Sequence, residues 1–112
     1  MPVVKLIADS GATKAEWCLL KNGRKKTLFT QGISPYFLNT EQIYQLLEKE
    51  LKPLLRKEEI HEIYYYGTGC ANPLNARSVK KAISKSFSGA KVEVTHDLMG
   101  AARALCGRDK GV

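Results

Sequence analysis

The sequence predicts one α/β domain, built on a five-stranded mixed sheet in the order 3-2-1-4-5 with flanking helices. Three observations lead to this prediction. Short strand-like segments come first and then alternate with segments whose apolar residues have helical spacing. The pair Asn22-Gly23 between two strand-like segments is typical of a β-hairpin. The first, fourth and fifth strands are linked through helices, so right-handed crossovers should make them parallel.

The first three strands are expected at residues 3–8, 15–21 and 25–31. Residues 3–8 are apolar and rich in β-branched side chains, as in a strand that is buried on both faces. In the second strand, Trp17 and Leu19 should share one face while Cys18 and Leu20 share the other. Leu28 is the clearest apolar anchor of the third strand. Together the three strands should form an antiparallel meander with the third strand at its edge.

The loop at residues 32–39 holds more aromatic and apolar side chains than a plain connector needs. Such loops often contact a ligand, whereas the alternative is that Tyr36 and Phe37 cover the edge of the sheet. Thr40 can cap the next helix, with Glu41 in its first turn, and Pro53 should kink or weaken its last turn. The apolar face of this helix is expected to consist of Ile43, Leu46, Leu47, Leu51, Leu54 and Leu55.

A fourth strand at residues 60–66 ends at a glycine-rich segment. Asn72 then caps a helix that begins with Pro73 and runs to about Phe87, where Gly89 closes it. A fifth strand at residues 91–95 leads to a helix of small residues at 98–105, which Gly107 stops. The apolar side chains that the first of these helices should bury are Leu74, Val79, Ile83 and Phe87.

Composition is that of an ordinary globular domain, with 112 residues of which 44% are hydrophobic and 26% charged. Cys18, Cys70 and Cys106 are odd in number and lack C-x-x-C spacing, so we expect reduced thiols in the cytoplasm, two of them in the core.

No apolar run could span a bilayer and no leader peptide is evident, so no membrane association is expected. The net charge of +7 is spread over turn and helix surfaces, so we do not expect a nucleic-acid partner.

Polar or glycine-rich loops follow all three parallel strands, and in an open sheet ligands sit at such carboxyl ends. The residues concerned are Asp9, Ser10 and Gly11 after the first strand, Gly67, Thr68 and Gly69 after the fourth, and His96 and Asp97 after the fifth. Ser10, Thr13 and the loop amides could donate to phosphate oxygens, and Asp9 would hold a metal ion or its bound water. The alternatives are a simple hairpin turn at residues 9–14 and a helix N-cap at Asp97. The convergence of the three loops favours a binding site.

These loops resemble motifs of the actin, hexokinase and Hsp70 superfamily. Residues 9–14 (DSGATK) are similar to its first phosphate motif, D-x-G-x-T-[KR], and residues 66–70 (YGTGC) and 95–104 (THDLMGAARA) fit the same superfamily. Over essentially the whole chain, the closest resemblance is to the BadF/BadG/BcrA/BcrD-type ATPases, and among them to the N-acetylglucosamine kinase-like proteins of bacteria. D-x-G-x-T alone is moderately specific, but its combination with G-x-G and D-x-x-G-A-A-x-A is considerably stronger. The resemblance implies a ribonuclease H-like (actin-like ATPase) N-terminal lobe of an ATP-dependent sugar kinase.

The same resemblance implies ATP and Mg²⁺ as cofactors and N-acetylglucosamine or a related amino sugar as substrate. The residues expected near the ATP phosphates and Mg²⁺ are Asp9, Ser10, Gly11, Thr13 and Lys14. Those expected to face the sugar are Ser34, Tyr36, Gly67, Thr68, Gly69 and Asp97. Asp97 would be the catalytic base for the sugar hydroxyl, and Asp9 would contact Mg²⁺ through a water molecule.

Two features depart from this family. Its sugar kinases commonly carry an Asn in the loop after the third strand, where this chain has Ser34-Pro35-Tyr36, so the identity of the sugar stays open. Its members also continue past a Gly-Val pair like that at 111–112 into a second phosphate loop and a second lobe. We therefore expect residues 1–112 to be an N-terminal lobe with little phosphotransfer of its own. Its exposed apolar surface would suit the missing C-terminal lobe or a homodimer.

Two other functions stay open. The ATPase component of a BadF/BadG-type reductase activator would need cysteines paired for an iron–sulfur cluster between subunits, and none with suitable spacing is present. A nuclease or nucleic-acid-binding domain on the same fold would need clustered carboxylates for two-metal chemistry. The fourth strand ends at Gly67 rather than at an acid, which leaves Asp9 and Asp97 without a clear third partner.

Overall fold

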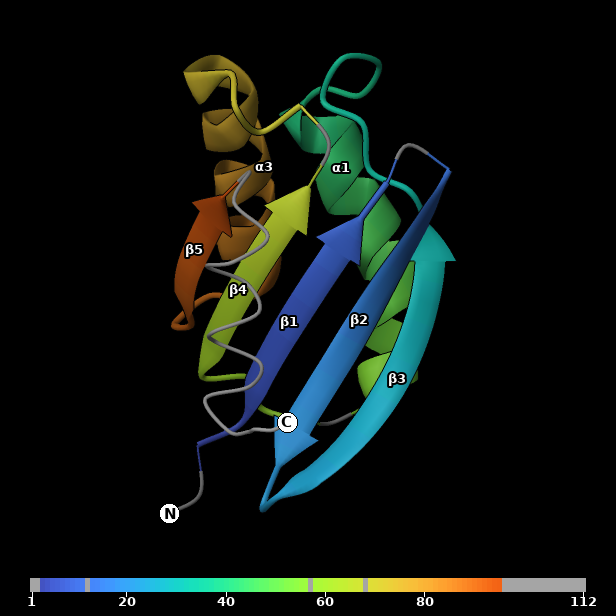
Figure 1. Cartoon of the computed structure of the whole chain (residues 1–112), viewed down its shortest axis with the longest axis vertical. Helices are drawn as coiled ribbons and strands as arrows, with labels where there is room; N and C mark the ends of the chain where they lie inside the picture. The colour runs from blue at the N-terminus through green and yellow to red at the C-terminus, as the bar shows by residue number, and fades with distance from the viewer. Residues whose placement is uncertain (1–2, 12, 57, 68, 96–112) are drawn as a thin grey trace.

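The structure, a computed structural model, describes residues 3–11, 13–56, 58–67 and 69–95 (Figure 1). The strands are β1 (Lys5–Ser10), β2 (Lys14–Lys21), β3 (Arg24–Gln31), β4 (Glu62–Gly67) and β5 (Lys91–Thr95). The helices are α1 (Thr40–Leu46), the π-helical turn η1 (Leu47–Leu51), α2 (Lys52–Leu55) and α3 (Pro73–Ser86). The helix expected at residues 98–105, with Gly107 after it, and Cys106 lie outside the described residues.

The five strands form one sheet in the order β3-β2-β1-β4-β5, which confirms the predicted order. β1, β4 and β5 are parallel, whereas β2 is antiparallel to both of its neighbours. α1, η1, α2 and α3 lie together on one face of this sheet (Figure 1). Among the described residues, no helix is both long and apolar enough to cross a membrane.

The hydrophobic core lies between this face of the sheet and the helices. Trp17 and Leu19 are buried in it, whereas Cys18 is buried on the other face opposite Ile7, so the predicted alternation along β2 is confirmed. The sheet contributes Leu6, Ala8, Trp17, Leu19, Leu28, Ile63, Tyr65 and Val92, and the helices contribute Ile43, Leu47, Leu51, Leu55, Val79 and Ile83. The hairpin before β3 has positive φ at both Asn22 (54°) and Gly23 (77°), as the type I′ turn requires.

The predicted cap of α1 is wrong by one residue. Asn39, not Thr40, is the N-cap: its side chain accepts the N–H of Gln42 at 2.8 Å, and the Gln42 side chain accepts the N–H of Asn39 at 2.9 Å. This reciprocal capping box satisfies two backbone donors at once, which a cap at Thr40 could not do with Ile43 at the corresponding position.

The helical segment from Thr40 to Leu55 contains a π-helical turn, η1, just before Pro53. Pro53 has no N–H to donate to the preceding turn, so a break in the α-helical pattern is expected here. Buried side chains recur every four residues, at Ile43, Leu47, Leu51 and Leu55. In a regular α-helix, side chains four residues apart are rotated by about 40° around the helix axis relative to each other. The wider π-helical turn offsets this rotation and keeps the buried side chains on one face. Leu54 does not belong to this face and is 40% exposed, contrary to the prediction.

α3 begins as predicted. The Asn72 side chain accepts the N–H groups of Leu74 and Asn75, and Pro73 is the first helical residue. Val79, Ile83 and Phe87 are buried as predicted. Leu74 is 68% exposed, so its predicted burial is wrong. It lies five residues before Val79, about 140° around the helix from the buried face.

Candidate functional site

β1 and β4 end level with each other at the same edge of the sheet. Ser10 is the register partner of Gly67, and Asp9 is the partner of Tyr66. β1 therefore extends two residues further than predicted and includes Asp9 and Ser10. Two of the three expected loops thus start side by side. The third candidate segment, with His96 and Asp97, lies outside the described residues, after β5 has paired Thr95 with Tyr66.

Ser10 holds two of these loops together. Its side chain is only 2% exposed, and its hydroxyl accepts the N–H of Ile33 at 3.0 Å while donating to the Gly11 carbonyl at 3.2 Å. The loop at residues 32–39 is thereby tied to the end of β1. Because the hydroxyl is buried and already bonded, Ser10 positions the site rather than presenting a free donor to it.

The turn between β1 and β2 is closed by the Gly11 N–H, which donates to the Lys14 carbonyl at 2.9 Å. Thr13 and Lys14 are exposed, and the Lys14 ammonium lies 5.1 Å from the centre of the Phe29 ring. A Cβ placed on Gly11 would meet, among described atoms within 4 Å, only the Lys14 carbonyl oxygen, at 3.6 Å. Packing against the described residues therefore does not require glycine at this position, and these residues leave space for a ligand beside its backbone.

Gly67 was expected in the loop after the fourth strand, but it is the last residue of β4. Gly67 and Gly69 have a different explanation from Gly11. A Cβ on Gly67 would lie 2.3 Å from the Tyr65 ring, so the fold itself excludes a side chain there. Gly69 has φ of +82°, and a Cβ on it would lie 2.9 Å from the Tyr36 ring. The β4–α3 loop therefore packs directly against the loop at residues 32–39. Thr68 lies outside the described residues.

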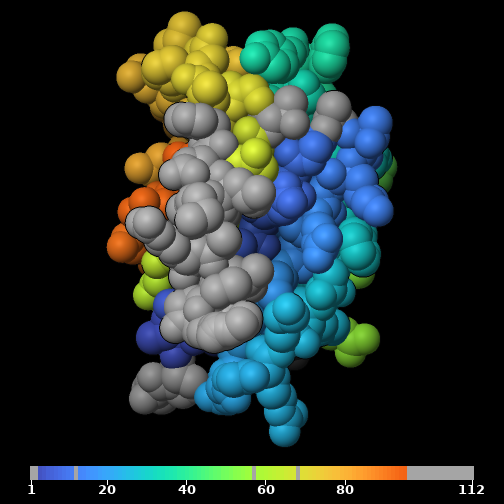
Figure 2. Space-filling view, viewed as in Figure 1, coloured from blue at the N-terminus to red at the C-terminus, as the bar shows by residue number. Residues whose placement is uncertain are grey.

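Two aromatic side chains stand open at this end of the molecule. Tyr36 is 64% and Phe37 is 82% exposed, so these side chains do not cover the edge of the sheet. Ser34 is buried beneath them, and its carbonyl accepts the N–H groups of Phe37 and Leu38. Figure 2 shows the loop after β3 and the start of α3 gathered at the same end of the molecule. Of the expected sugar-facing residues in this loop, Tyr36 is accessible and Ser34 is not.

Asp9 and Glu16 form an acidic pair at the end of β1. They are direct register partners on antiparallel strands, so their side chains share one face, and both are exposed. Neither carboxylate has a hydrogen bond or ion pair with another described residue. Within the described part of the chain, no group of three or more His, Cys, Asp or Glu side chains could hold a metal ion. One or two carboxylates nevertheless suit Mg²⁺, which usually keeps several waters and binds phosphate as well.

Sequence reasoning missed Glu16. The signal was present, because the alternation that turns Trp17 into the core turns Glu16 to the opposite face. An antiparallel turn between Asp9 and Glu16 then brings both acids to the same level.

The layer beneath the loops is neutral and buried. Burial raises the pKa of the Tyr65 phenol well above its usual value. The Tyr65 hydroxyl has no hydrogen-bond partner among the described residues. Burial also raises the pKa of the Cys70 thiol to about 11. Cys70 is therefore a protonated thiol at physiological pH and an unsuitable nucleophile.

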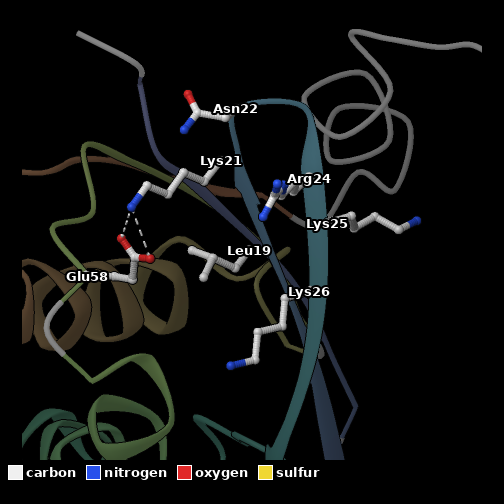
Figure 3. Close-up of a pocket in the computed structure, with 7 residues that line it drawn as sticks. All are labelled: Leu19, Lys21, Asn22, Arg24, Lys25, Lys26 and Glu58. Atoms are coloured by element: carbon white, nitrogen blue, oxygen red, sulfur yellow. Dashed lines mark hydrogen bonds and ion pairs between the residues drawn. The ribbon is translucent and has the colours of Figure 1, made fainter.

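A hollow of about 590 Å³ lies beside the β2–β3 hairpin (Figure 3), at the opposite end of the sheet from these loops (Figure 1). It is separate from the candidate site. No protein-family model matches the chain, and no curated protein matches it.

Proposed function

We propose that this chain forms the phosphate-binding lobe of an ATP-dependent kinase that phosphorylates a hydroxyl of an amino sugar such as N-acetylglucosamine. In this proposal the sheet has the ribonuclease H-like (actin-like ATPase) fold. The observation that carries the proposal is that β1 and β4 end side by side, with Ser10 opposite Gly67. The Ser10 hydroxyl also accepts the N–H of Ile33, which brings the loop at residues 32–39 to the same place. Three loops therefore open at one end of the parallel strands, where ligands bind in sheets of this type.

The nucleotide phosphates would lie beside the β1–β2 turn. The open space at Gly11 allows close approach of phosphate oxygens to the backbone, and Thr13 and Lys14 are exposed next to it. Asp9 and Glu16 would hold Mg²⁺, directly or through water, and the bound ion would neutralise charge on the phosphate oxygens.

The sugar would lie between the loop at residues 32–39 and the β4–α3 loop. The exposed Tyr36 ring offers an apolar face against which a sugar ring can pack, and its contact with Gly69 fixes where it stands. Ser10 and Ser34, both buried, would support these loops without contacting the substrate. Asp97 would accept the proton of the attacking hydroxyl, the role that an Asp has in protein kinases.

The alternatives receive less support from the described residues. Cys18 and Cys70 are buried, on opposite sides of the sheet, which does not suit a cluster shared between subunits. The described carboxylates do not form the cluster that two-metal nuclease chemistry needs.

Nuclear magnetic resonance titration of the ¹⁵N-labelled chain tests the proposal at residue level. Mg·ATP should shift the amide signals of Gly11, Thr13 and Lys14, and N-acetylglucosamine should shift those of Tyr36 and Gly69. Glu16→Gln should weaken the Mg·ATP response, while Lys49→Gln, an exposed helix substitution, should leave it unchanged. Shifts confined to the β2–β3 hairpin, or none at millimolar ligand, would contradict the proposal.

A further inference from the structure

A basic groove runs between the β2–β3 hairpin and the segment from α2 to β4. It consists of two adjoining hollows, of about 590 and 360 Å³, that share Leu19, Lys21, Lys26 and Glu58. Arg24 lines the first hollow, and Leu54, Leu55 and Arg56 line the second. The groove lies far from the loops of the candidate site, at the opposite end of β1 and β4 (Figure 1).

Among the described residues, most of the positive charge in this groove is not neutralised. Glu58 is its single described acid, and it binds the Lys21 ammonium at 3.1 Å (Figure 3). Arg24, Lys26 and Arg56 form no ion pair with any described carboxylate. Several other lysines of the described chain are paired: Lys5 with Glu62, Lys52 with Glu48, Lys85 with Glu41 and Lys91 with Glu93. The groove therefore favours an anionic occupant.

The groove also offers an apolar surface. Leu54 is 40% exposed within it, and Leu19 and Leu55 line it more deeply. None of the described residues that line the two hollows is aromatic, so single-stranded nucleic acid would lack the stacking platform that it usually uses. A chain that carries both carboxylates and an aliphatic side chain would use the charge and the apolar surface together.

We propose that this groove binds an acidic peptide segment of a partner protein, with an aliphatic side chain on Leu54 and carboxylates on Lys26, Arg24 and Arg56. A second copy of this chain is a poor occupant because its net charge is +7. In this proposal the basic side chains of the hairpin form a recognition surface and are not only solvated side chains of a turn. The site is independent of the proposed kinase function, and either can be present without the other.

The hairpin supplies a matched pair of variants. Lys25 and Lys26 are neighbours on β3 and both border the first hollow, but their side chains leave opposite faces of the sheet, and the Lys25 ammonium points away from the hollow (Figure 3). Fluorescence anisotropy would use the labelled peptide EELEELEE as probe, with EESEESEE and a ten-nucleotide thymidylate as comparators. Lys26→Gln combined with Arg56→Gln should weaken binding of the first peptide about tenfold, while Lys25→Gln should change it less than about twofold.

Two further variants keep the test independent of folding. Glu58→Gln should tighten binding because it frees Lys21 for the peptide, a gain that a misfolded variant could not produce. Leu54→Ser should weaken binding of EELEELEE but leave that of EESEESEE unchanged.

Four results would overturn the proposal. The first is an equal loss for the Lys25 and Lys26 variants, which would reflect net charge alone. The second is tighter binding of the thymidylate than of either peptide. The third is self-association of Lys26→Gln with unchanged peptide affinity, which would mean that Lys26 only protects the exposed edge of β3. Failure of all probes to bind the wild-type chain would also overturn it.

Discussion

The Ser10 hydroxyl accepts the backbone N–H of Ile33 at 3.0 Å, across 23 residues of sequence. Ser10→Ala should remove this acceptor and leave a buried N–H without a partner, at a cost of about 1–3 kcal/mol in the free energy of unfolding. Thr13→Ala, an exposed hydroxyl in the adjacent turn, should change it by less than about 0.5 kcal/mol. Urea denaturation measures both, and hydrogen exchange should show faster exchange at the Ile33 amide of Ser10→Ala. Unchanged exchange there would contradict the tethering role.

Asp9 and Glu16 should repel each other when no cation is bound. Because like charges directly opposite on paired strands are unfavourable, Glu16→Gln should stabilise the metal-free chain by about 0.2–1 kcal/mol. Mg²⁺ at about ten times its dissociation constant should stabilise the wild-type chain by about 1.4 kcal/mol and the variant by less. Calorimetry with MgCl₂ against NaCl of equal ionic strength measures this, with Glu59→Gln as control. Equal Mg²⁺ responses in wild type and Glu16→Gln would contradict a shared cation site.

Alanine at Gly11 and at Gly67 should have opposite consequences. Gly67→Ala places a methyl group 2.3 Å from the Tyr65 ring and should destabilise the fold by about 1–3 kcal/mol. Among described atoms, Gly11→Ala meets only an ordinary contact at 3.6 Å, so stability should change by less than about 0.5 kcal/mol. If phosphate approaches the backbone at residue 11, Gly11→Ala should still weaken Mg·ATP binding. Thermal unfolding and nucleotide titration separate the two effects, and Tyr65→Leu should partly rescue Gly67→Ala.

Stability should fall at alkaline pH. Tyr65 and Cys70 have folded-state pKa values raised by burial above their ordinary values of 10.0 and 9.0. From about pH 9 upwards the unfolded chain loses these protons while the folded chain keeps them, so the free energy of unfolding decreases as pH rises. Below about pH 8 neither group contributes to the pH dependence. Urea midpoints measured from pH 7 to pH 10.5 should show this decline.

Tyr65→Phe should remove part of the alkaline loss. At neutral pH the same variant should be as stable as wild type or about 1 kcal/mol more stable, because the deleted hydroxyl is buried and has no partner among the residues that the structure describes. Tyr36→Phe, which removes a hydroxyl from an exposed tyrosine, is the matched control. An identical alkaline decline in wild type and Tyr65→Phe would show that Tyr65 is not responsible.

Patterns of local sequence predicted much of this fold. Asn22-Gly23 specified its hairpin because both positions need positive φ, and Asn72-Pro73 specified the start of α3 because it combines a side-chain cap with a residue that needs no N–H donor. Strand order followed from which connections contain a helix.

The errors arose where tertiary contacts decide. Asn39 and Thr40 are both good caps, and only the reciprocal bond with Gln42 distinguishes them. In the site, the end of an apolar run suggested that Ser10 belongs to an open loop. Its pairing with Gly67 and its bond to Ile33 depend on segments distant in sequence, so its burial could not be inferred locally. Glu16 needed the register of β1 and β2 in addition to its alternation.

Because β1 and β4 end at paired residues, insertions or deletions within either strand would disturb the candidate site. One residue inserted in either strand would displace its loop by about 3.3 Å relative to the other and turn its last side chain to the opposite face. Ser10 would then face away from Ile33, or Gly67 would no longer lie beside Ser10. Insertions and deletions between divergent versions of this sequence should therefore accumulate outside these two strands, for example within residues 35–38, where the exposed loop can absorb them.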